Sequence, residues 1–459
     1  MKRLVWLLIL VVLTIMAYAG DKTNKTLTID DIFPSDRVLD VKVTVEPKDW
    51  DTIRKQSQDF ETALADRRQY HPIDSPYTYV EATVSIDGVI FLQVGIRKKG
   101  FLGSSRNPNR PSLKVKLNQV DKTGQIDGLT NLTFNNNEQD PSLISQFMGY
   151  SLFNQVGLPA PRCAYAKLTV NGQDLGVYTH VERIHKPLLK RAFGNEDGVL
   201  YEGTLVDFYP DWAGSFEHKL GSDEVGRPKV QQLIEMLRQP DENIETDIGK
   251  LVDLDSFYTF WAMEGLLGFW DGYSGNRNNF FIYLNPETDK FHFIPWGADG
   301  LFERFSPSWY KGDKKDPVSV KIRGGLIANQ LYQLELGRQR YEQTLRKIIE
   351  QRWNEKDLLA ETERIEALVK PYLTTTQSRL VQSADKFVEL LAEKRKFIRQ
   401  RRGEIMTEIA EGMPKWEVKP VQPFVISRME QEISFYFGCI TGGCIGCVST
   451  ILVSWLINR

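Results

Sequence analysis

The first part of the chain alternates between apolar and polar residues, which is the pattern of half-buried β-strands. Asp87-Gly88 and Asn171-Gly172 each separate two such runs, and dipeptides of this kind favour tight hairpin turns. We therefore expect a β-rich region built largely from hairpins. The expected strands cover residues 41–45, 80–86, 90–96, 113–117, 164–170 and 174–182.

The apolar positions take up a helical period later in the chain. Asp140, Pro141 and Gly157 have the types and spacing of an N-cap, a first helical residue and a terminating glycine, so they predict a helix over 141–156. Residues 57–70 are polar and fit either a helix or an insertion. Further helices are expected over 186–193, 229–238 and 253–269, and a helical pattern covers 330–413.

Two short apolar runs, 280–284 and 291–296, are separated by a connector rich in turn-forming residues. This arrangement predicts a β-hairpin. Because a hairpin brings its two ends together, Asp271, residues 276–279 and Asp299 should converge at one edge of a sheet. A plain turn is the alternative reading for Asp271-Gly272 taken alone.

The side chains expected to converge supply hard oxygen ligands, which suit Mg²⁺ held against phosphates. Protein kinases combine an Asp near the substrate hydroxyl with an Asn and a second Asp on the metal. By that logic Asp271 is the candidate base or hydroxyl-positioning group. The candidate metal ligands are Asn278, Asn279 and Asp299.

A phosphate clamp is expected in the glycine- and serine-containing loop between two strands, where small residues let backbone amides approach an anion. Lys114 and Lys116 alternate on the second strand and so share a face, and either could contact a nucleotide. Ordinary lysines on a solvated strand face are the alternative. The candidate nucleotide-binding residues are Arg97, Lys99, Ser104, Ser105, Lys114, Lys116 and Glu182.

These elements form an α+β plan of two lobes with a ligand cleft between them. The expected organisation is a leader (1–19), an exposed lead-in (20–36), a β-rich lobe (37–183), a helix-rich lobe that contains the metal-site hairpin (184–413), a linker (414–434) and an apolar helix (435–457).

Composition narrows the class of protein. The 459 residues are 41% hydrophobic and 26% charged, which are globular values. A net charge of −2 argues against a general nucleic-acid binder. Cys444 and Cys447 have C-x-x-C spacing, but no second pair or histidine follows, so these small residues more simply fill a helix contact than bind zinc.

The two ends of the chain suggest targeting. Met1 to Ala19 has a basic start, an apolar run and a small-residue cleavage pattern, so it predicts a signal peptide, with an uncleaved anchor as the alternative. The uncharged run 435–457 is long enough to span a bilayer or, failing that, packs on the protein as an apolar tail. Gly438, Gly442 and Gly446 would allow a homodimer contact. We expect an extracytoplasmic, membrane-anchored protein of the secretory pathway.

Several motifs occur in an order that resembles the CotH kinase family, a group named after a spore-coat protein. They include Trp270-Asp-Gly-Tyr273, Asn276-Arg-Asn-Asn-Phe280 and Phe291-His-Phe-Ile-Pro-Trp296. Arg97 to Ser105, followed by Ser112-Leu-Lys-Val-Lys-Leu117, is similar to the family's basic loop and strand. The resemblance extends over roughly residues 37–405.

The resemblance implies an atypical protein-kinase-like fold and ATP-dependent protein phosphorylation with Mg²⁺. It slightly favours Lys114 as the nucleotide lysine. The expected helix 141–156 holds no acid, and Gln146 stands where relatives often carry Glu. Glu182 is then the alternative partner for the lysine or a marker of the hinge between the lobes.

One position departs from the family pattern, which usually reads Trp-Asp-x-Asp where this chain has Trp296-Gly297-Ala298-Asp299. Two functions therefore stay open: a kinase that phosphorylates Ser or Thr of a secreted or surface and coat protein, and a catalytically impaired module for surface binding and assembly. A metal-dependent hydrolase using Asp271 and Asp299 is a third reading, but it lacks a histidine-rich ligand set.

Overall fold

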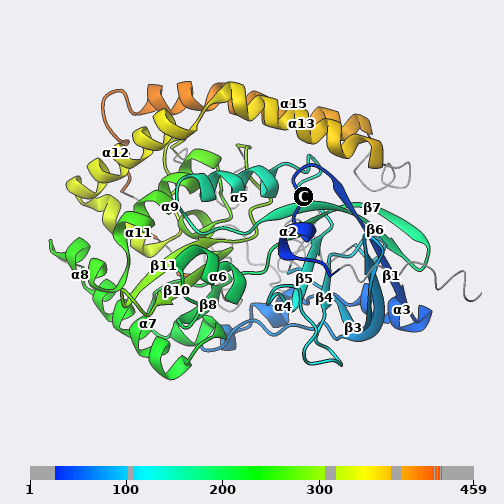
Figure 1. The fold of residues 1–459 in the computed structure, drawn as a ribbon. Coiled ribbons are helices and arrows are strands. Elements are labelled where there is room, and N and C mark those ends of the chain that lie inside the picture. The colour runs from blue at the N-terminus through cyan, green and yellow to red at the C-terminus, as the bar shows by residue number, and fades with distance from the viewer. Residues whose placement is uncertain are drawn as a thin grey trace, which may run out of the picture.

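The computed structural model describes residues 26–101, 107–240, 242–304, 317–373 and 384–417, with 419, 420, 422, 423 and 425. In this part of the chain the fold class expected from the sequence, α+β with two lobes, is confirmed. A strand-built lobe lies on one side and a helix-rich lobe on the other, as Figure 1 shows.

The first lobe is a closed barrel with the strand order β1-β2-β3-β4-β5-β7-β6. Antiparallel hairpins make most of it, and the parallel pairing of β1 with β6 closes it. Closure removes the exposed sheet edges, a feature that strand patterning alone did not predict. The strands are β1 (Val38–Val45), β2 (Val80–Ile86), β3 (Val89–Lys98), β4 (Leu113–Lys116), β5 (Asn131–Asn135), β6 (Cys163–Val170) and β7 (Gln173–Val181).

The expected hairpins at Asp87-Gly88 and Asn171-Gly172 are confirmed as β2–β3 and β6–β7. Both asparagine or aspartate positions have φ near +48° and both glycines lie near φ +80°, so each turn uses the left-handed region that these residues tolerate. Small elements beside the barrel strands are α2 (Ile29–Ile32), α3 (Pro47–Lys55), α4 (Phe60–Ala63) and the 3₁₀ turn η1 (Asp66–Gln69).

The lead-in was expected to be exposed, and among its described residues this was wrong for Leu27 and Ile32. Leu27 is 3% exposed and Ile32 is fully buried, and both pack into the barrel core. Thr28 caps α2 by accepting a hydrogen bond from Asp31 N–H, and Asp127 accepts one from Ile29 N–H at 2.7 Å. Two apolar residues in a polar stretch are too few to show a period, which is why the pattern missed them.

The helix expected over 141–156 is shorter at its start. It forms α5 (Ser145–Gln155), and the four residues before it make a turn. Asp140 still serves this helix end, because its carboxylate accepts a hydrogen bond from Ser145 N–H at 2.7 Å. Pro141 therefore lies in the turn before the helix and not at the first helical position.

The second lobe surrounds a sheet of order β11-β10-β8-β9. The expected hairpin is confirmed, since β10 pairs with β11 in antiparallel register from Phe280↔Pro295 to Asn285↔Lys290. Strands β8 and β9 were missed by the patterning. The strands are β8 (Val199–Gly203), β9 (Glu217–Leu220), β10 (Phe280–Asn285) and β11 (Lys290–Pro295).

Helices cover this sheet and continue beyond it. The expected helix 186–193 is confirmed, and those at 229–238 and 253–269 are confirmed with shifted ends. In Figure 1, α13 and α15 lie side by side along one edge of the molecule. The helices are α6 (Lys186–Phe193), α7 (Asp223–Arg238), α8 (Ile244–Leu251), α9 (Leu254–Leu267), α10 (Tyr273–Asn276), α11 (Leu326–Gln333), α12 (Glu335–Arg352), α13 (Glu355–Val369) and α15 (Ala384–Glu408), with the 3₁₀ turns η3 (Ala213–Ser215) and η5 (Lys370–Tyr372).

One apolar cluster joins the two lobes. It contains the core of the second lobe and also Tyr165, Val177 and Val181 from the barrel strands β6 and β7. The barrel interior forms a separate cluster. The outer face of the barrel is therefore packed against the helix-rich lobe. We keep the name cleft for the region between the lobes where the sequence predicts a ligand.

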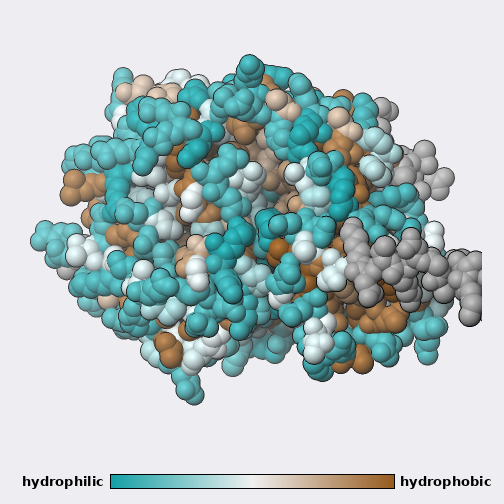
Figure 2. Space-filling view, viewed as in Figure 1, coloured by the Kyte–Doolittle hydropathy of each residue, from teal (hydrophilic) through white to brown (hydrophobic). Residues whose placement is uncertain are grey.

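The two ends of the predicted organisation lie largely outside the described residues. This applies to the leader 1–19 and to the apolar run 435–457 with its glycines. Among the helices that are described, none combines the length and apolar character needed to cross a membrane. From the linker, Trp416 and Val425 are buried against the second-lobe core. The face seen in Figure 2 is mostly hydrophilic, with small separate apolar patches.

Candidate active site

The loop between α9 and β10 carries Asp271. Helix α9 begins with Asp253 as its cap, whose carboxylate accepts from Ser256 N–H at 2.9 Å, and ends at Gly268 with φ +70°. The chain then makes the short α10 before it enters β10. We call residues 268–279 the acidic loop.

Three asparagine amides hold the Asp271 carboxylate. Asn276 donates from Nδ2 at 2.6 Å, Asn279 donates at 2.8 Å, and Asn278 donates at 3.2 Å. Burial raises the pKa of Asp271 to about 6, although all three hydrogen bonds act to lower it. The carboxylate is thus fixed in one orientation and half-buried, and it is largely ionised at neutral pH.

Two fully buried acids support the acidic loop from the protein side. Glu264 accepts hydrogen bonds from Tyr273 N–H at 2.7 Å and Ser274 N–H at 2.9 Å. Asp207 accepts from the Tyr273 hydroxyl at 3.1 Å and from Leu326 N–H at 2.7 Å. Sequence reasoning missed both residues. The available signal for Glu264 was an acid inside the otherwise apolar stretch 260–267 of α9, because such a residue is rarely buried without a partner.

Asp299 lies beyond β11, on the other arm of the hairpin. Burial is the largest cause that raises the pKa of Asp299, to about 7, and the nearby charges of Asp271 and Asp140 add to it. Lys99 acts in the opposite direction. The hairpin also links its two ends directly, since Trp296 N–H donates to the Asn279 carbonyl at 2.9 Å. The convergence expected from the sequence is therefore observed.

The donor set fits a hard divalent cation. Burial raises the pKa of both half-buried carboxyl groups, and the charge of Asp271 raises that of Asp299 further, which is the state expected where a cation is needed to balance them. Within the described residues, no group of three or more His, Cys, Asp or Glu could hold a metal unaided. Amide oxygens and phosphate oxygens would have to complete the coordination.

The asparagines differ in how free their oxygens are. The Asn278 side-chain oxygen already accepts from Leu205 N–H at 3.2 Å. The Asn276 oxygen is buried and has no hydrogen-bond partner among the described atoms. Asn276 was not assigned to the metal from the sequence, but its geometry makes it as good a ligand candidate as Asn278.

The barrel wall of the cleft is basic. Arg97 on β3 is paired in register with Lys114 on β4, and both side chains lie on the outer face. Burial lowers the pKa of Lys114 to about 7, and the charges of Arg183, Arg97 and Lys219 lower it further. Burial also lowers the pKa of Lys99, whereas the nearby Asp299 raises it. An anion in this cleft would relieve the crowding of positive charge.

The remaining basic candidates have visible contacts. Lys116 lies with its ammonium group over the Tyr79 ring, 5.6 Å from the centroid. Arg97 donates to the Ser75 hydroxyl at 3.1 Å. Ser104 and Ser105 lie outside the described residues.

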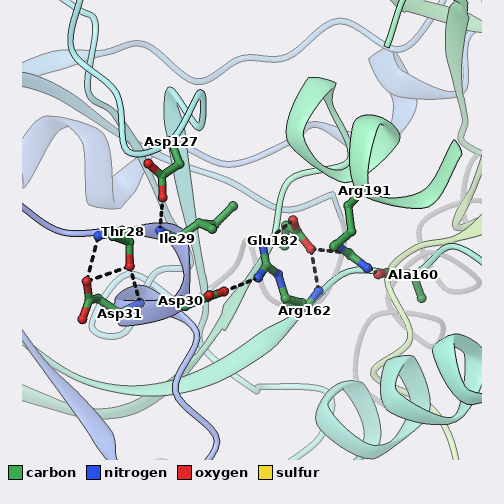
Figure 3. Close-up of polar contacts among 9 residues, drawn as sticks. All are labelled: Thr28, Ile29, Asp30, Asp31, Asp127, Ala160, Arg162, Glu182 and Arg191. Carbon is green, nitrogen blue, oxygen red and sulfur yellow. Dashed lines mark hydrogen bonds and ion pairs between the residues drawn. The ribbon is translucent and has the colours of Figure 1, made fainter. Parts of the chain in front are cut away.

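Glu182 makes a different set of contacts from those proposed for it. It is fully buried after β7, and its carboxylate pairs with Arg191 at 2.8 Å and with Arg162 at 3.4 Å, as Figure 3 shows. Arg162 also bonds to Asp30 of α2. These ion pairs tie Glu182 to arginines at the junction of the lobes, which fits a hinge marker better than a partner for a nucleotide lysine.

Helix α5 supplies no acid for that lysine either. Its Gln146 is buried and accepts a hydrogen bond from the Asn135 amide at 3.1 Å. The kinase-type pairing of a lysine with a helix glutamate has no counterpart at this helix.

Gly297 occupies the position where an acid was expected. Its φ of +51° is left-handed, and a Cβ placed there would overlap the side-chain oxygen of Asn279. The local backbone is thus adapted to glycine, and Asn279 fills the space next to it.

Comparison with known proteins places this chain. The sequence profile described as CotH kinase protein matches residues 96–405, which is more than half of the chain. The chain belongs to the CotH kinase family. This confirms the resemblance read from the motifs. The matched range includes the basic loop, the acidic loop and the hairpin.

The chain is similar to other CotH proteins at low identity. It is 23% identical to the inner spore coat protein H of Bacillus subtilis (strain 168) over 59% of this chain and 78% of that protein. It is also 23% identical to the invasin CotH2 of Rhizopus delemar over 61% of this chain, but only 50% of that protein.

A solved structure, the Helicobacter pylori proinflammatory kinase CtkA, matches with 12% identity over 67% of this chain and 91% of that one. Its TM-score of 0.29 is too low to support an argument.

Proposed function

We propose that this CotH protein is a kinase that transfers a phosphoryl group from Mg-ATP to Ser or Thr of a secreted, surface or coat protein. The observation that carries the proposal is the juxtaposition of Asp271 and Asp299 with a basic wall formed by Arg97, Lys99 and Lys114. Phosphoryl transfer needs both halves, a metal site and a phosphate clamp.

The acid wall, formed by Asp271, Asp299 and the asparagines of the acidic loop, would hold the metal and the acceptor. Asp299 would be one metal ligand, and an oxygen of Asn276, Asn278 or Asn279 would be the second protein ligand. Bound Mg²⁺ would neutralise the phosphate charge that develops during transfer. Asp271, held by its three amides, would orient the acceptor hydroxyl.

The chemical step is a displacement at the γ-phosphorus. The hydroxyl oxygen of Ser or Thr forms a bond to that phosphorus, while the bond from the phosphorus to the β,γ-bridging oxygen breaks and ADP leaves. Asp271 accepts the hydroxyl proton. Its pKa of about 6 leaves it ionised at neutral pH, and it is therefore ready for this role.

The basic wall would bind the phosphates. Lys99 is the cation whose charge lowers the pKa of Asp299, so it belongs to the part of the basic wall that faces the proposed metal ligand. Lys114 lies among Arg97, Arg183 and Lys219, and Glu202 is the acid that acts on it. We keep Lys114 as the nucleotide lysine and place Lys99 between the phosphates and the metal.

A catalytically impaired binding module is the second candidate, and Gly297 favours it. The family acid is missing there, and Asn279 occupies the space that its side chain would need. Under this reading the cleft binds an anionic ligand, with or without a metal, and the protein assembles with others at a surface. The names of the two relatives, a spore coat protein and an invasin, agree with a surface location for either function.

We extend the proposal to location. The signal peptide 1–19 would direct the protein out of the cytosol, and the apolar run 435–457 would anchor it or form a homodimer contact. Carbonate extraction of membranes from expressing cells tests the anchor, because a spanning helix stays in the pellet whereas a docked tail is released.

The deciding experiment uses the purified full chain. ATP binding is measured by calorimetry with Mg²⁺ and again with EDTA, and transfer of labelled γ-phosphate is measured on the chain itself and on dephosphorylated casein as the probe. The kinase proposal expects Mg²⁺-dependent binding and transfer. Binding without transfer supports the impaired module, and the absence of ATP binding would overturn the kinase proposal.

A further inference from the structure

A segment of the barrel lobe reaches across to the second lobe beside the acidic loop. Residues 57–79, here called the strap, connect α3 to β2 and include α4 and η1. Ala63 and Leu64 are buried within it, at 4% and 2% exposure, whereas many of its other residues are exposed, so it is held at a few points along a surface path. The sequence predicted only a helix or an insertion here.

Arg68 of the strap is the anchor on the second lobe. It is 3% exposed, and its Nη2 donates to the carbonyls of Thr204 and Leu205. Its guanidinium group also stacks over the Trp212 ring, 5.1 Å from the centroid.

The strap backbone docks as well. The Ser215 hydroxyl donates to the Arg68 carbonyl. A Cβ at Gly214 would overlap the Tyr70 carbonyl, so the two backbones touch at a position where only glycine fits.

The anchored residues are in direct contact with the acidic loop. Leu205 has a left-handed φ of +46°, and its N–H donates to the Asn278 oxygen at 3.2 Å. Val206 N–H donates to the Arg277 carbonyl at 2.9 Å. Because the Asn278 amide in turn donates to Asp271, an unbroken series of contacts runs from Arg68 through Leu205 and Asn278 to Asp271.

The other end of the strap contacts the basic wall. Ser75 accepts from Arg97, and the Tyr77 hydroxyl donates to the Gly100 carbonyl at 2.7 Å. The Arg97 guanidinium also lies over the Tyr79 ring, 5.3 Å from the centroid. One segment therefore contacts the second lobe through Arg68 and the barrel side through Ser75, Tyr77 and Tyr79.

We propose that the strap fixes the basic wall relative to the acidic loop, and that Arg68 is a positioning residue for Asp271, acting through Leu205 and Asn278. The role in phosphoryl transfer rests on the proposed function. Arg68 does not touch the reacting atoms. It holds Leu205 in a backbone conformation that a branched apolar residue rarely adopts, and this directs the Leu205 N–H at Asn278.

Burying the Arg68 charge costs free energy, which argues that this residue has a role beyond packing. Burial and the nearby Arg277 charge lower the pKa of Arg68 to about 9, and two of its nitrogens have no hydrogen-bond partner among the described atoms. A buried charge with this few partners is unfavourable by itself. Its compensation comes from the two carbonyls and the Trp212 ring, and one of those carbonyls belongs to Leu205, whose N–H holds Asn278 of the acidic loop.

The test compares Arg68→Gln with Arg67→Gln in the full chain. Arg67 is the neighbour in η1, but its side chain is 56% exposed and pairs with Asp74 inside the strap. For Arg68→Gln we expect kcat to fall roughly 10- to 100-fold, as a small misplacement of a catalytic group does, with KM for ATP changed by less than about twofold. Arg67→Gln should leave both constants unchanged.

Two further measurements separate positioning from general destabilisation. The double variant of Arg68→Gln with Asn278→Ala should lower kcat far less than the product of the two single losses, because both substitutions act through one series of contacts. In the double variant of Arg67→Gln with Asn278→Ala, the two effects on kcat should simply multiply. Hydrogen exchange of the Leu205 and Val206 amides should speed up about tenfold in Arg68→Gln alone. If Arg68→Gln does not fold, Arg68→Lys, which keeps the charge, takes its place.

The outcomes are distinguishable from failure of the proposed function. If the unmodified chain transfers no phosphate, the kinase proposal fails, and the exchange measurement still decides whether Arg68 holds the acidic loop. Unchanged exchange at Leu205 and Val206, or multiplicative effects with Asn278→Ala, would overturn the strap proposal.

Discussion

The two walls of the cleft hold their charged side chains in different ways. On the second lobe, Asp271 receives three amide hydrogen bonds, and the fully buried Glu264 and Asp207 fix the loop behind it. On the barrel, burial lowers the pKa of both Lys99 and Lys114, and Lys114 also lies among the cations Arg183, Arg97 and Lys219. Asp271 is therefore held by several donors, whereas Lys114 is surrounded by charges of its own sign.

This difference indicates what each wall contributes. A carboxylate held by several donors before substrate arrives is preorganised, so changes there should act mainly on the rate of the chemical step. Cations that repel one another gain a partner when an anion binds, so changes there should act mainly on ligand affinity. Substitutions on each wall test whether the two walls differ in this way.

The largest effect is expected for Asp271→Asn. The amide cannot accept the hydroxyl proton, so phosphotransfer should fall roughly 10²- to 10⁴-fold, the usual contribution of a general base. The size of the side chain is unchanged, and the melting temperature should shift by only a few degrees. Radiolabel transfer and thermal unfolding measure the two quantities.

The matched control for that variant is Asp289→Asn, in the turn of the same hairpin, where the carboxylate is exposed and pairs with Lys229. It should retain full activity. An Asp271→Asn protein as active as this control would exclude Asp271 from the chemistry and remove the central argument for the acid wall.

The next largest effect concerns Asp299 and the metal. Asp299→Ala should weaken Mg²⁺ binding, seen by calorimetry with ATP present, by roughly 100-fold because a carboxylate ligand is lost. In the unmodified chain, Mg²⁺ affinity should rise with pH up to about 7, where Asp299 loses its proton, by roughly tenfold per unit of pH below that value.

The Asp299 carboxyl group also makes the folding stability of the metal-free protein depend on pH. The folded-state pKa of Asp299 is raised from 3.8 to about 7, so its contribution to stability is present at low pH and is lost as pH rises through 7. Metal-free Asp299→Asn should therefore gain melting temperature relative to the unmodified chain at pH 8, but not at pH 4. An equal difference at both pH values would contradict the raised pKa.

Local sequence signals predicted the parts of this molecule that depend on short-range geometry. Asp87-Gly88 and Asn171-Gly172 fix their hairpins through backbone angles, and the two runs around residues 285–290 pair because their connector is short. The barrel closure between β1 and β6 was not predictable in this way. It joins strands more than a hundred positions apart, and alternation of apolar residues does not state which strands pair.

The site divides along the same line. Asp271 and Asp299 could be proposed because they flank one hairpin and match a family pattern. Asp207 and Arg68 were missed because each bonds to groups distant in sequence, which leave no motif. Glu264 bonds to the nearer Tyr273 and Ser274 N–H groups, and its signal was an acid among apolar residues. For Glu182 the sequence left a lysine partner and a hinge marker open, because an acid after a strand does not show which of several cations it will meet, and here Arg162 and Arg191 reach it.

A smaller effect is expected on the basic wall. Lys114→Met should raise the Kd for Mg-ATP roughly tenfold, the value of one charge-assisted hydrogen bond, with a smaller change in kcat. Lys116→Met tests the rival lysine on the same strand, whose ammonium already lies over Tyr79. Lys42→Met, an exposed lysine on β1, is the control. A larger loss for Lys116 than for Lys114 would reverse the assignment.

The smallest effect is expected at Gly297, the position where the family usually carries an acid and this chain carries glycine. Restoring the acid with Gly297→Asp places a Cβ against the Asn279 oxygen at a left-handed φ, so it should cost about 1 kcal/mol of stability. Gly297→Ala carries the same Cβ without the carboxylate. Both variants should loosen Asn279 from Asp271 and lower transfer a few-fold.

If position 297 faces the metal, Gly297→Asp should bind Mg²⁺ a few-fold more tightly than Gly297→Ala, because it alone adds an oxygen ligand. Equal Mg²⁺ affinity in the two variants would mean that this position no longer serves a metal, and the acid wall would then be explained better as part of a binding module than as half of a kinase site.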